Sequence, residues 1–151
     1  MATSIDPEPA DSTESRLLIA ELEAELDGAY PPESQHGYGI DKLITEGVHF
    51  FIVRSDGLAA GCGGVQLFGS EYGELKRMFI RPAFRGRGLG RLLIGLLAEH
   101  TRGHDVPLLR LETGILQHEA IRLYEGMGFY QIPPFGAYRL DPNSVYYERQ
   151  S

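Results

Sequence analysis

A glycine-rich turn between a strand-like segment and an apolar helix constrains this chain more than any other feature. Residues 74–81 have the pattern of a β-strand that stops at Pro82, which cannot donate to a sheet ladder. Residues 89–101 place leucines on one face of a helix. The glycines of the intervening stretch, 84–91, allow close backbone approach, and the first amides and the dipole of a helix favour negative charge. We therefore expect a phosphate group to bind at this turn.

The spacing of the glycines excludes two common phosphate-binding motifs. A P-loop needs Lys-Ser or Lys-Thr after its second glycine, and a dinucleotide fingerprint needs a third glycine where Arg91 stands. The pattern present is Arg-x-x-Gly-x-Gly, at Arg85, Gly88 and Gly90. It resembles the acyl-CoA pyrophosphate loop of the GNAT superfamily of N-acetyltransferases. The alternative is a solvated basic turn that only caps a helix.

This resemblance implies that acetyl-CoA is the co-substrate and that the loop amides wrap its diphosphate. In the family, the strand before the loop splays from its neighbour, and its free backbone groups bind the pantetheine as an added strand would. One of those N–H groups can polarise the thioester carbonyl. The residues expected to bind acetyl-CoA are Met78, Phe79, Ile80, Arg85, Gly86, Arg87, Gly88, Leu89, Gly90, Arg91 and Gln117.

A second segment, residues 117–129, also resembles the family, whose pattern here is Asn-x-x-Ala-x-x-Leu-Tyr-x-x-x-Gly-Phe. Gln117 replaces the asparagine, and Tyr124 occupies the position of the tyrosine that faces the thiolate. The resemblance implies that Tyr124 is the general acid, whereas the helix alone would suggest an ordinary buried aromatic. Glu74 opens the core strand where some members carry a general-base glutamate, and a plain surface carboxylate is the alternative.

The order of predicted elements is also that of the GNAT fold. We expect one N-acetyltransferase domain over residues 1–151, of α/β (α+β) class. Its core would be a mixed, mostly antiparallel, twisted sheet of about seven strands, flanked by about four helices. The expected strands are 4–8, 48–54, 58–68, 74–81, 108–112, 129–132 and 144–149, and the expected helices are 12–27, 40–45, 89–101 and 118–127.

The acceptor is expected to be a primary amine of a small molecule or peptide that enters opposite CoA. The loops after the first helix and between the last two strands would line its site, which nominates Tyr30, Glu33, Phe135 and Tyr138. Aromatic rings beside an acid suit a cationic amine, although loop tyrosines also serve simply to cover a core. No serine or cysteine sits in a nucleophile-elbow motif, which favours direct transfer in a ternary complex.

The distribution of charged residues helps to distinguish an acetyltransferase from a nucleic-acid-binding domain. Residues 1–46 carry eleven acids and two bases, whereas residues 75–98 carry six bases and no acid, on a chain of net charge −7. A local basic patch on an acidic chain favours a small anionic ligand over a nucleic-acid backbone. A nucleic-acid-binding domain is thus the weaker alternative, and a non-catalytic acyl-CoA sensor is the stronger one. We expect a cytoplasmic protein with no membrane or nucleic-acid partner, and a homodimer is left open.

The single cysteine and the five histidines offer little sign of other chemistry. Cys62 lies in a run of glycines and alanines and is expected to be a packed strand residue. His100 and His104 have the spacing of zinc ligands on a helix, but Gly103 between them suggests that the helix has already ended, and no glutamate follows His100. We expect exposed surface histidines and no metal.

Overall fold

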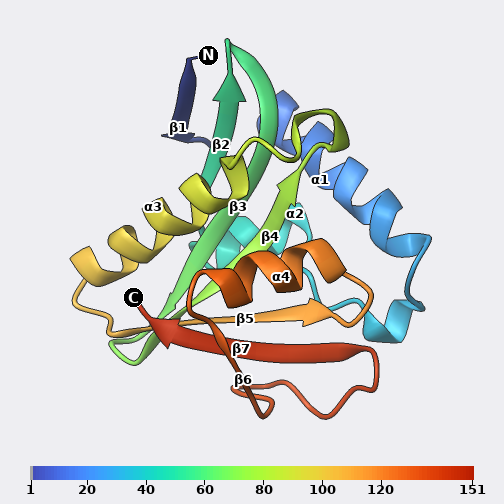
Figure 1. The fold of residues 1–151 in the computed structure, drawn as a ribbon, viewed down its shortest axis with the longest axis vertical. Coiled ribbons are helices and arrows are strands. Elements are labelled where there is room, and N and C mark those ends of the chain that lie inside the picture. The colour runs from blue at the N-terminus through green and yellow to red at the C-terminus, as the bar shows by residue number, and fades with distance from the viewer. Residues whose placement is uncertain (1) are drawn as a thin grey trace.

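Seven strands form one twisted sheet in the order β1-β2-β3-β4-β5-β7-β6 (Figure 1). The computed structural model describes residues 2–151. Neighbouring strands are antiparallel except for β4 and β5, which run parallel. The strands are β1 (Thr3–Pro7), β2 (His49–Ser55), β3 (Leu58–Phe68), β4 (Tyr72–Ile80), β5 (Leu108–Gly114), β6 (Tyr130–Ile132) and β7 (Ser144–Gln150). The mixed, mostly antiparallel sheet predicted from the sequence is confirmed.

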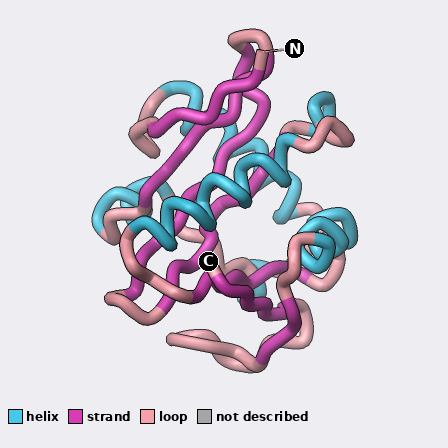
Figure 2. Tube along the Cα trace, turned by 60° about the vertical axis from the view of Figure 1, so that its left-hand side comes forward, coloured by secondary structure: helices cyan, strands magenta, loops and turns pink. Residues whose placement is uncertain are grey.

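Four α-helices cover the two faces of this sheet (Figure 2). They are α1 (Thr13–Asp27), α2 (Ile40–Thr45), α3 (Leu89–Gly103) and α4 (His118–Gly126). Ser12 caps the start of α1: its hydroxyl accepts a hydrogen bond from the Ser15 amide at 3.1 Å and so satisfies one free amide. Within residues 2–151, no helix has the length and apolar character needed to cross a membrane.

Each face of the sheet has its own apolar core. Helices α3 and α4 pack on one face, where Leu93, Ile94 and Leu97 of α3 are fully buried. Helices α1 and α2 pack on the other face, where Leu18 and Ile19 are fully buried. The leucine spacing that predicted the α3 helix is thus the spacing of its buried face, and these contacts hold the helix against the sheet.

Strands β4 and β5 diverge after a short paired region. Their ladder covers only Tyr72↔Leu108, Gly73↔Leu109 and Glu74↔Arg110, although both strands continue beyond it. In Figure 1, β4 rises steeply from the end it shares with β5, which runs nearly level. The backbone of β4 from residue 75 onward therefore faces no partner strand on that side. The predicted splay is confirmed.

A bulge in β4 and glycines in β3 shape this region. Arg77 adopts a left-handed φ of 55°, and the register between β3 and β4 shifts there. A Cβ on Gly63 would lie 2.4 Å from the Met78 sulfur, and one on Gly61 would lie 2.4 Å from the Phe79 carbonyl oxygen. Because no side chain fits at such distances, the glycine run of β3 is what allows the bulged strand to approach.

Candidate active site

The glycine-rich loop ends in an open helix N-terminus. Gly86 and Gly88 have left-handed φ values of 78° and 77°, and a Cβ on either would meet no protein atom within 4 Å. The amide of Leu92 donates to the Gly88 carbonyl at 3.1 Å, so the three preceding amides have no acceptor within the helix. Arg87 and Arg91 flank the loop and are exposed. A diphosphate fits these residues, because free amides and open space lie on the same side of a helix dipole.

Two of the four arginines around this loop are already paired with α1. Arg81 binds Glu21 through two hydrogen bonds of 3.0 and 2.7 Å. Arg85 contacts Glu25 at 3.0 Å and donates to the Ile80 carbonyl oxygen at 2.8 Å. These pairs join the loop to a helix some 60 residues earlier, and they neutralise part of the acidic N-terminal segment. Arg85, expected to bind CoA, thus also holds the loop in place.

A cavity lies where β4 and β5 diverge. It brings together residues from β4, from β5, from α4 and from the loop after α1. Its lining includes Tyr30, Ser34, Gln35, His36, Gly37, Leu75, Arg77, Met78, Leu111, Glu112, Thr113, Gly114, Gln117 and Tyr124. The cavity therefore joins the α4 side of the sheet to the α1 side, and reactants from the two faces can meet in it.

Tyr124 reaches the cavity from α4. Its side chain is buried against Phe129, with ring centroids 5.6 Å apart. Burial raises the pKa of the Tyr124 phenol well above its ordinary value, and the nearby Glu112 carboxylate raises it further. No hydrogen bond to a residue within 2–151 holds its hydroxyl. The Tyr124 hydroxyl is thus protonated and can donate its hydrogen to a bound molecule.

Glu112 reaches the same cavity from β5. Burial raises the pKa of its carboxyl, and a 2.8 Å hydrogen bond from the Ser144 hydroxyl and the charge of His36 partly oppose that rise. A carboxylate with a raised pKa in a cavity is a suitable proton acceptor near neutral pH. Glu112 was not among the residues nominated from the sequence. Its one signal there is a carboxylate in a strand segment that also carries three leucines.

Glu74, the base nominated from the sequence, lies outside this cavity. It is 3% exposed, so it is not a surface carboxylate. The Lys76 ammonium donates to it at 2.8 Å and the Tyr138 hydroxyl at 2.5 Å. The ammonium also lies 3.9 Å from the centre of the Tyr38 ring. Glu74 therefore anchors the loop between β6 and β7, and its action as a base stays a prediction.

Tyr30 and Gln117 meet at the cavity wall. The Tyr30 hydroxyl accepts a hydrogen bond from the Leu116 amide at 2.9 Å and donates to the Gln117 side-chain oxygen at 3.5 Å. The structure thus places a residue nominated for the acceptor beside one nominated for CoA. Gln117 is the first residue before α4, so this contact also positions the helix that carries Tyr124.

The other three residues nominated for the acceptor lie apart from Tyr30. Glu33 and Tyr138 line a neighbouring depression formed with residues 139–143. Phe135 lines neither hollow; it is buried against Tyr72 and Tyr146, with ring centroids 5.5 and 6.1 Å away. Phe135 is therefore a core residue that packs the loop between β6 and β7 against the sheet.

The cysteine is buried as expected, whereas the histidines depart from expectation. Cys62 is fully buried, and burial raises the pKa of its thiol to about 12. Helix α3 continues through Gly103, so His100 and His104 keep the helical spacing that the sequence seemed to interrupt. His100 is half-buried and lies against His49 of β2, while His104 is exposed. The expectation of exposed histidines is therefore confirmed for His104 and wrong for His100, because β2 passes beside the end of α3.

Comparison with known proteins agrees with this arrangement. Residues 16–129 match the model of the acetyltransferase (GNAT) family. An IAA acetyltransferase from Azospirillum brasilense is 38% identical over 133 residues, which cover 87% of each chain. The chain therefore belongs to the GNAT acetyltransferase family, as the two sequence motifs implied.

Solved structures show the same fold. A protein from Klebsiella pneumoniae with a proposed acyl-CoA N-acyltransferase activity is 35% identical, with a TM-score of 0.82 over 98% of this chain and 97% of its own. The PaiA N-acetyltransferase from Thermoplasma acidophilum, solved with coenzyme A, is 16% identical, with a TM-score of 0.78 over all of both chains. The second likeness is one of fold alone.

Proposed function

We propose that this protein moves the acetyl group of acetyl-CoA to a primary amine of a small molecule or peptide. One observation carries the proposal: the cavity between β4 and β5 joins Tyr124, from one side of the sheet, to Glu112, from the other. A reaction between a thioester and an amine needs a proton removed at one reactant and delivered at the other. The two side chains offer these functions within one cavity.

The loop and β4 would hold the co-substrate. The three free amides at the start of α3 would bind the diphosphate, and Arg87 and Arg91 would add positive charge. The unpaired edge of β4 at residues 78–80 would bind the pantetheine by backbone hydrogen bonds. When bound, acetyl-CoA supplies the activated acetyl group. Its carbonyl oxygen would accept a hydrogen bond from one amide of this edge.

Tyr124 would act as the general acid. Its raised pKa keeps the phenol protonated at neutral pH, and the absence of a hydrogen bond to residues 2–151 leaves the proton available. The phenol can therefore deliver a proton to the departing sulfur. A donor fixed in a buried cavity does this without reorganising solvent.

Glu112 would act as the general base, directly or through a water molecule. An alkylamine has a pKa of about 10.4 and must lose a proton before it attacks. Glu112 lies on the cavity wall shared with the loop after α1, where an acceptor can approach. The Ser144 hydrogen bond fixes its carboxylate. Glu74, already bound by Lys76 and Tyr138, would instead shape the acceptor side.

Transfer would be direct, without an acetylated enzyme. Cys62 is the single cysteine of the chain, and it is fully buried with a pKa raised to about 12. Such a thiol is protonated and inaccessible, and so it is a poor nucleophile. An amine held beside Glu112 would therefore attack the acetyl group in a ternary complex.

The test is a screen of amines, amino acids, polyamines and peptides that records both free CoA and product mass. We expect at least one amine to gain one acetyl group as thiol is released. Binding of acetyl-CoA with no transfer to any of these amines would instead support the non-catalytic sensor. Retention on nucleic acid that weakens with salt, without acetyl-CoA binding, would support the nucleic-acid-binding alternative.

A further inference from the structure

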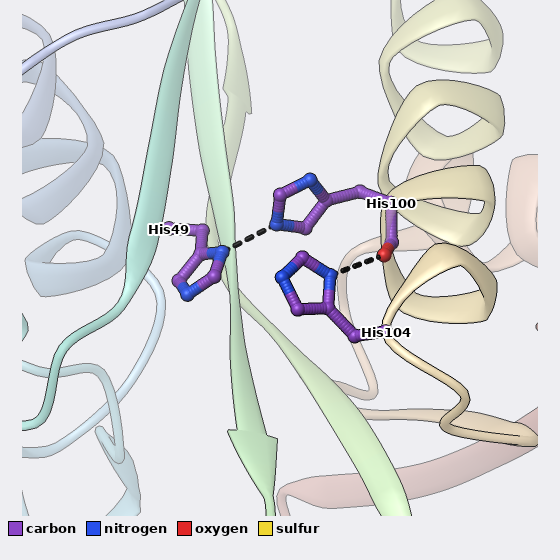
Figure 3. Close-up of side chains that lie close together, drawn as sticks. All are labelled: His49, His100 and His104. Carbon is purple, nitrogen blue, oxygen red and sulfur yellow. Dashed lines mark hydrogen bonds between the residues drawn. The ribbon is translucent and has the colours of Figure 1, made fainter.

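Three histidines meet on the α3 side of the sheet, at the end of α3 that lies away from the glycine-rich loop (Figure 3). His49 is the first residue of β2, and His100 and His104 lie four residues apart at the end of α3. One ligand atom from each lies within 4.8 Å of the others. The ring centroids are 4.6 Å apart for His49 and His100 and for His100 and His104. No role in acetyl transfer uses this cluster.

The hydrogen bonds around the rings orient imidazole nitrogens of all three histidines toward one another. The Nδ1 atom of His104 lies 2.8 Å from the His100 carbonyl oxygen. Because a carbonyl only accepts, this nitrogen carries the hydrogen and Nε2 keeps its lone pair. A metal-binding histidine is commonly oriented by such a bond from its other nitrogen. The Nδ1 atom of His49 shares a hydrogen bond with Nε2 of His100, as Figure 3 shows. A metal ion would replace that hydrogen bond, with the proton moving to the other ring nitrogen of its histidine so that both facing lone pairs bind the ion.

We propose that His49, His100 and His104 bind one divalent transition metal ion, with zinc as the expected ion and water in the remaining position. Imidazole nitrogens suit zinc, copper and nickel, whereas magnesium and calcium prefer oxygen. Zinc–nitrogen bonds of about 2.0–2.1 Å place tetrahedral ligand atoms about 3.3 Å apart. Ligand atoms already within 4.8 Å can reach that spacing by side-chain rotation. His104 is exposed and has room to rotate.

The site would stabilise the fold rather than take part in acetyl transfer. His100 lies twelve residues after Gly88, which corresponds to about 18 Å along the helix and away from the expected diphosphate. The ligands of the proposed metal site come from β2 and from the end of α3, which are distant in sequence and adjacent only after folding. An ion that binds only the folded arrangement raises the melting temperature by mass action.

The test uses the full chain, freed of metal with a chelator and then titrated with Zn²⁺ and, separately, with Co²⁺. We expect one Zn²⁺ per chain by calorimetry, a higher melting temperature, and visible Co²⁺ absorption typical of a tetrahedral site with nitrogen ligands. His100→Gln and His104→Gln should each weaken Zn²⁺ binding by at least about a hundredfold, since outer partners alone change affinity by about 10–100-fold. His118→Gln, at an exposed histidine of α4, is the matched control and should bind as wild type does.

Three results would overturn the proposal. The first is the absence of saturable Zn²⁺ binding below about millimolar concentration. The second is undiminished binding in both cluster variants, which would place the ion elsewhere. The third is an equal rise in melting temperature with Mg²⁺, which would show a general salt effect. Circular dichroism verifies that each variant is folded, and His104→Gln keeps the test decisive because its exposed ring contributes little to the core.

Discussion

Replacing Tyr124 with phenylalanine separates its chemical role from its packing role. The change removes one hydroxyl that makes no hydrogen bond within residues 2–151, and the ring stays against Phe129. Loss of a general acid costs about 10²–10⁴ in rate, or about 2.7–5.5 kcal/mol of transition-state stabilisation. Loss of an unpaired buried hydroxyl should change the free energy of unfolding by less than about 1 kcal/mol. We expect a slow enzyme that is as stable as wild type.

The assay is thiol release at saturating acetyl-CoA, with acetyl-CoA affinity measured by calorimetry. The matched control is Tyr147→Phe, which removes another buried phenol, one that donates to Glu125 at 2.9 Å outside the cavity. It should lower the free energy of unfolding by about 0.5–1.5 kcal/mol and leave the rate nearly unchanged. An unaltered rate in Tyr124→Phe would refute the acid role. A large loss of acetyl-CoA affinity with the saturated rate intact would make Tyr124 a binding residue instead.

Three further predictions follow from the loop, the carboxylate and the core. Gly88→Ala and Gly47→Ala both put a Cβ at a left-handed φ with open space around it, so each should cost about 1–2 kcal/mol of stability, while only Gly88→Ala should weaken acetyl-CoA binding in calorimetry. Because the pKa of Glu112 is raised, kcat/KM should rise with pH through a value above the ordinary carboxyl range, and Glu112→Gln should remove that limb of the pH–rate profile. Leu97→Ala should lower the free energy of unfolding by about 2–5 kcal/mol in urea denaturation, because Leu97 is fully buried, with acetyl-CoA affinity retained. Equal acetyl-CoA affinity in both glycine variants, an unchanged pH profile, or a smaller loss of stability would contradict them in turn.

The sequence predicts the fold well because local signals and tertiary contacts agree. The leucines that marked one helical face are the residues that α3 buries, among them Leu93 and Leu97. The glycines at 86 and 88 adopt the left-handed backbone that a close approach requires. Even the splay of β4 was accessible from the family resemblance. The helix and the loop depend on residues near one another in the chain, whereas the splay, between strands whose paired residues are more than thirty positions apart, was expected only from the resemblance.

The site was only partly predictable because its decisive contacts are long-range. Two carboxylates, Glu74 and Glu112, look equivalent in the sequence. The pairing of Glu74 with Arg110 places Glu74 in the last rung of the ladder between β4 and β5, and places Glu112 two residues beyond it, in the cavity. That register is set by the packing of the whole sheet, which no local pattern reveals.

The arginines and histidines show the same limit. Arg85 was expected to bind the diphosphate, yet it also contacts Glu25, sixty residues earlier. His49 meets His100 only because β2 passes beside the end of α3. Charge and composition indicate which groups are present, whereas the partner of each group depends on the tertiary fold.

A single-turnover experiment tests the central claim most directly. Equal amounts of protein and acetyl-CoA would be mixed with an excess of an amine found in the screen, and the masses of protein and amine followed together with free thiol. Direct transfer of the acetyl group from acetyl-CoA to the amine, in the cavity that Tyr124 and Glu112 line, predicts one rate constant for the acetylated amine and the thiol. The mass of the protein should stay constant throughout. Thiol release that precedes acetylation of the amine, with an acetyl group carried on the protein in between, would contradict it.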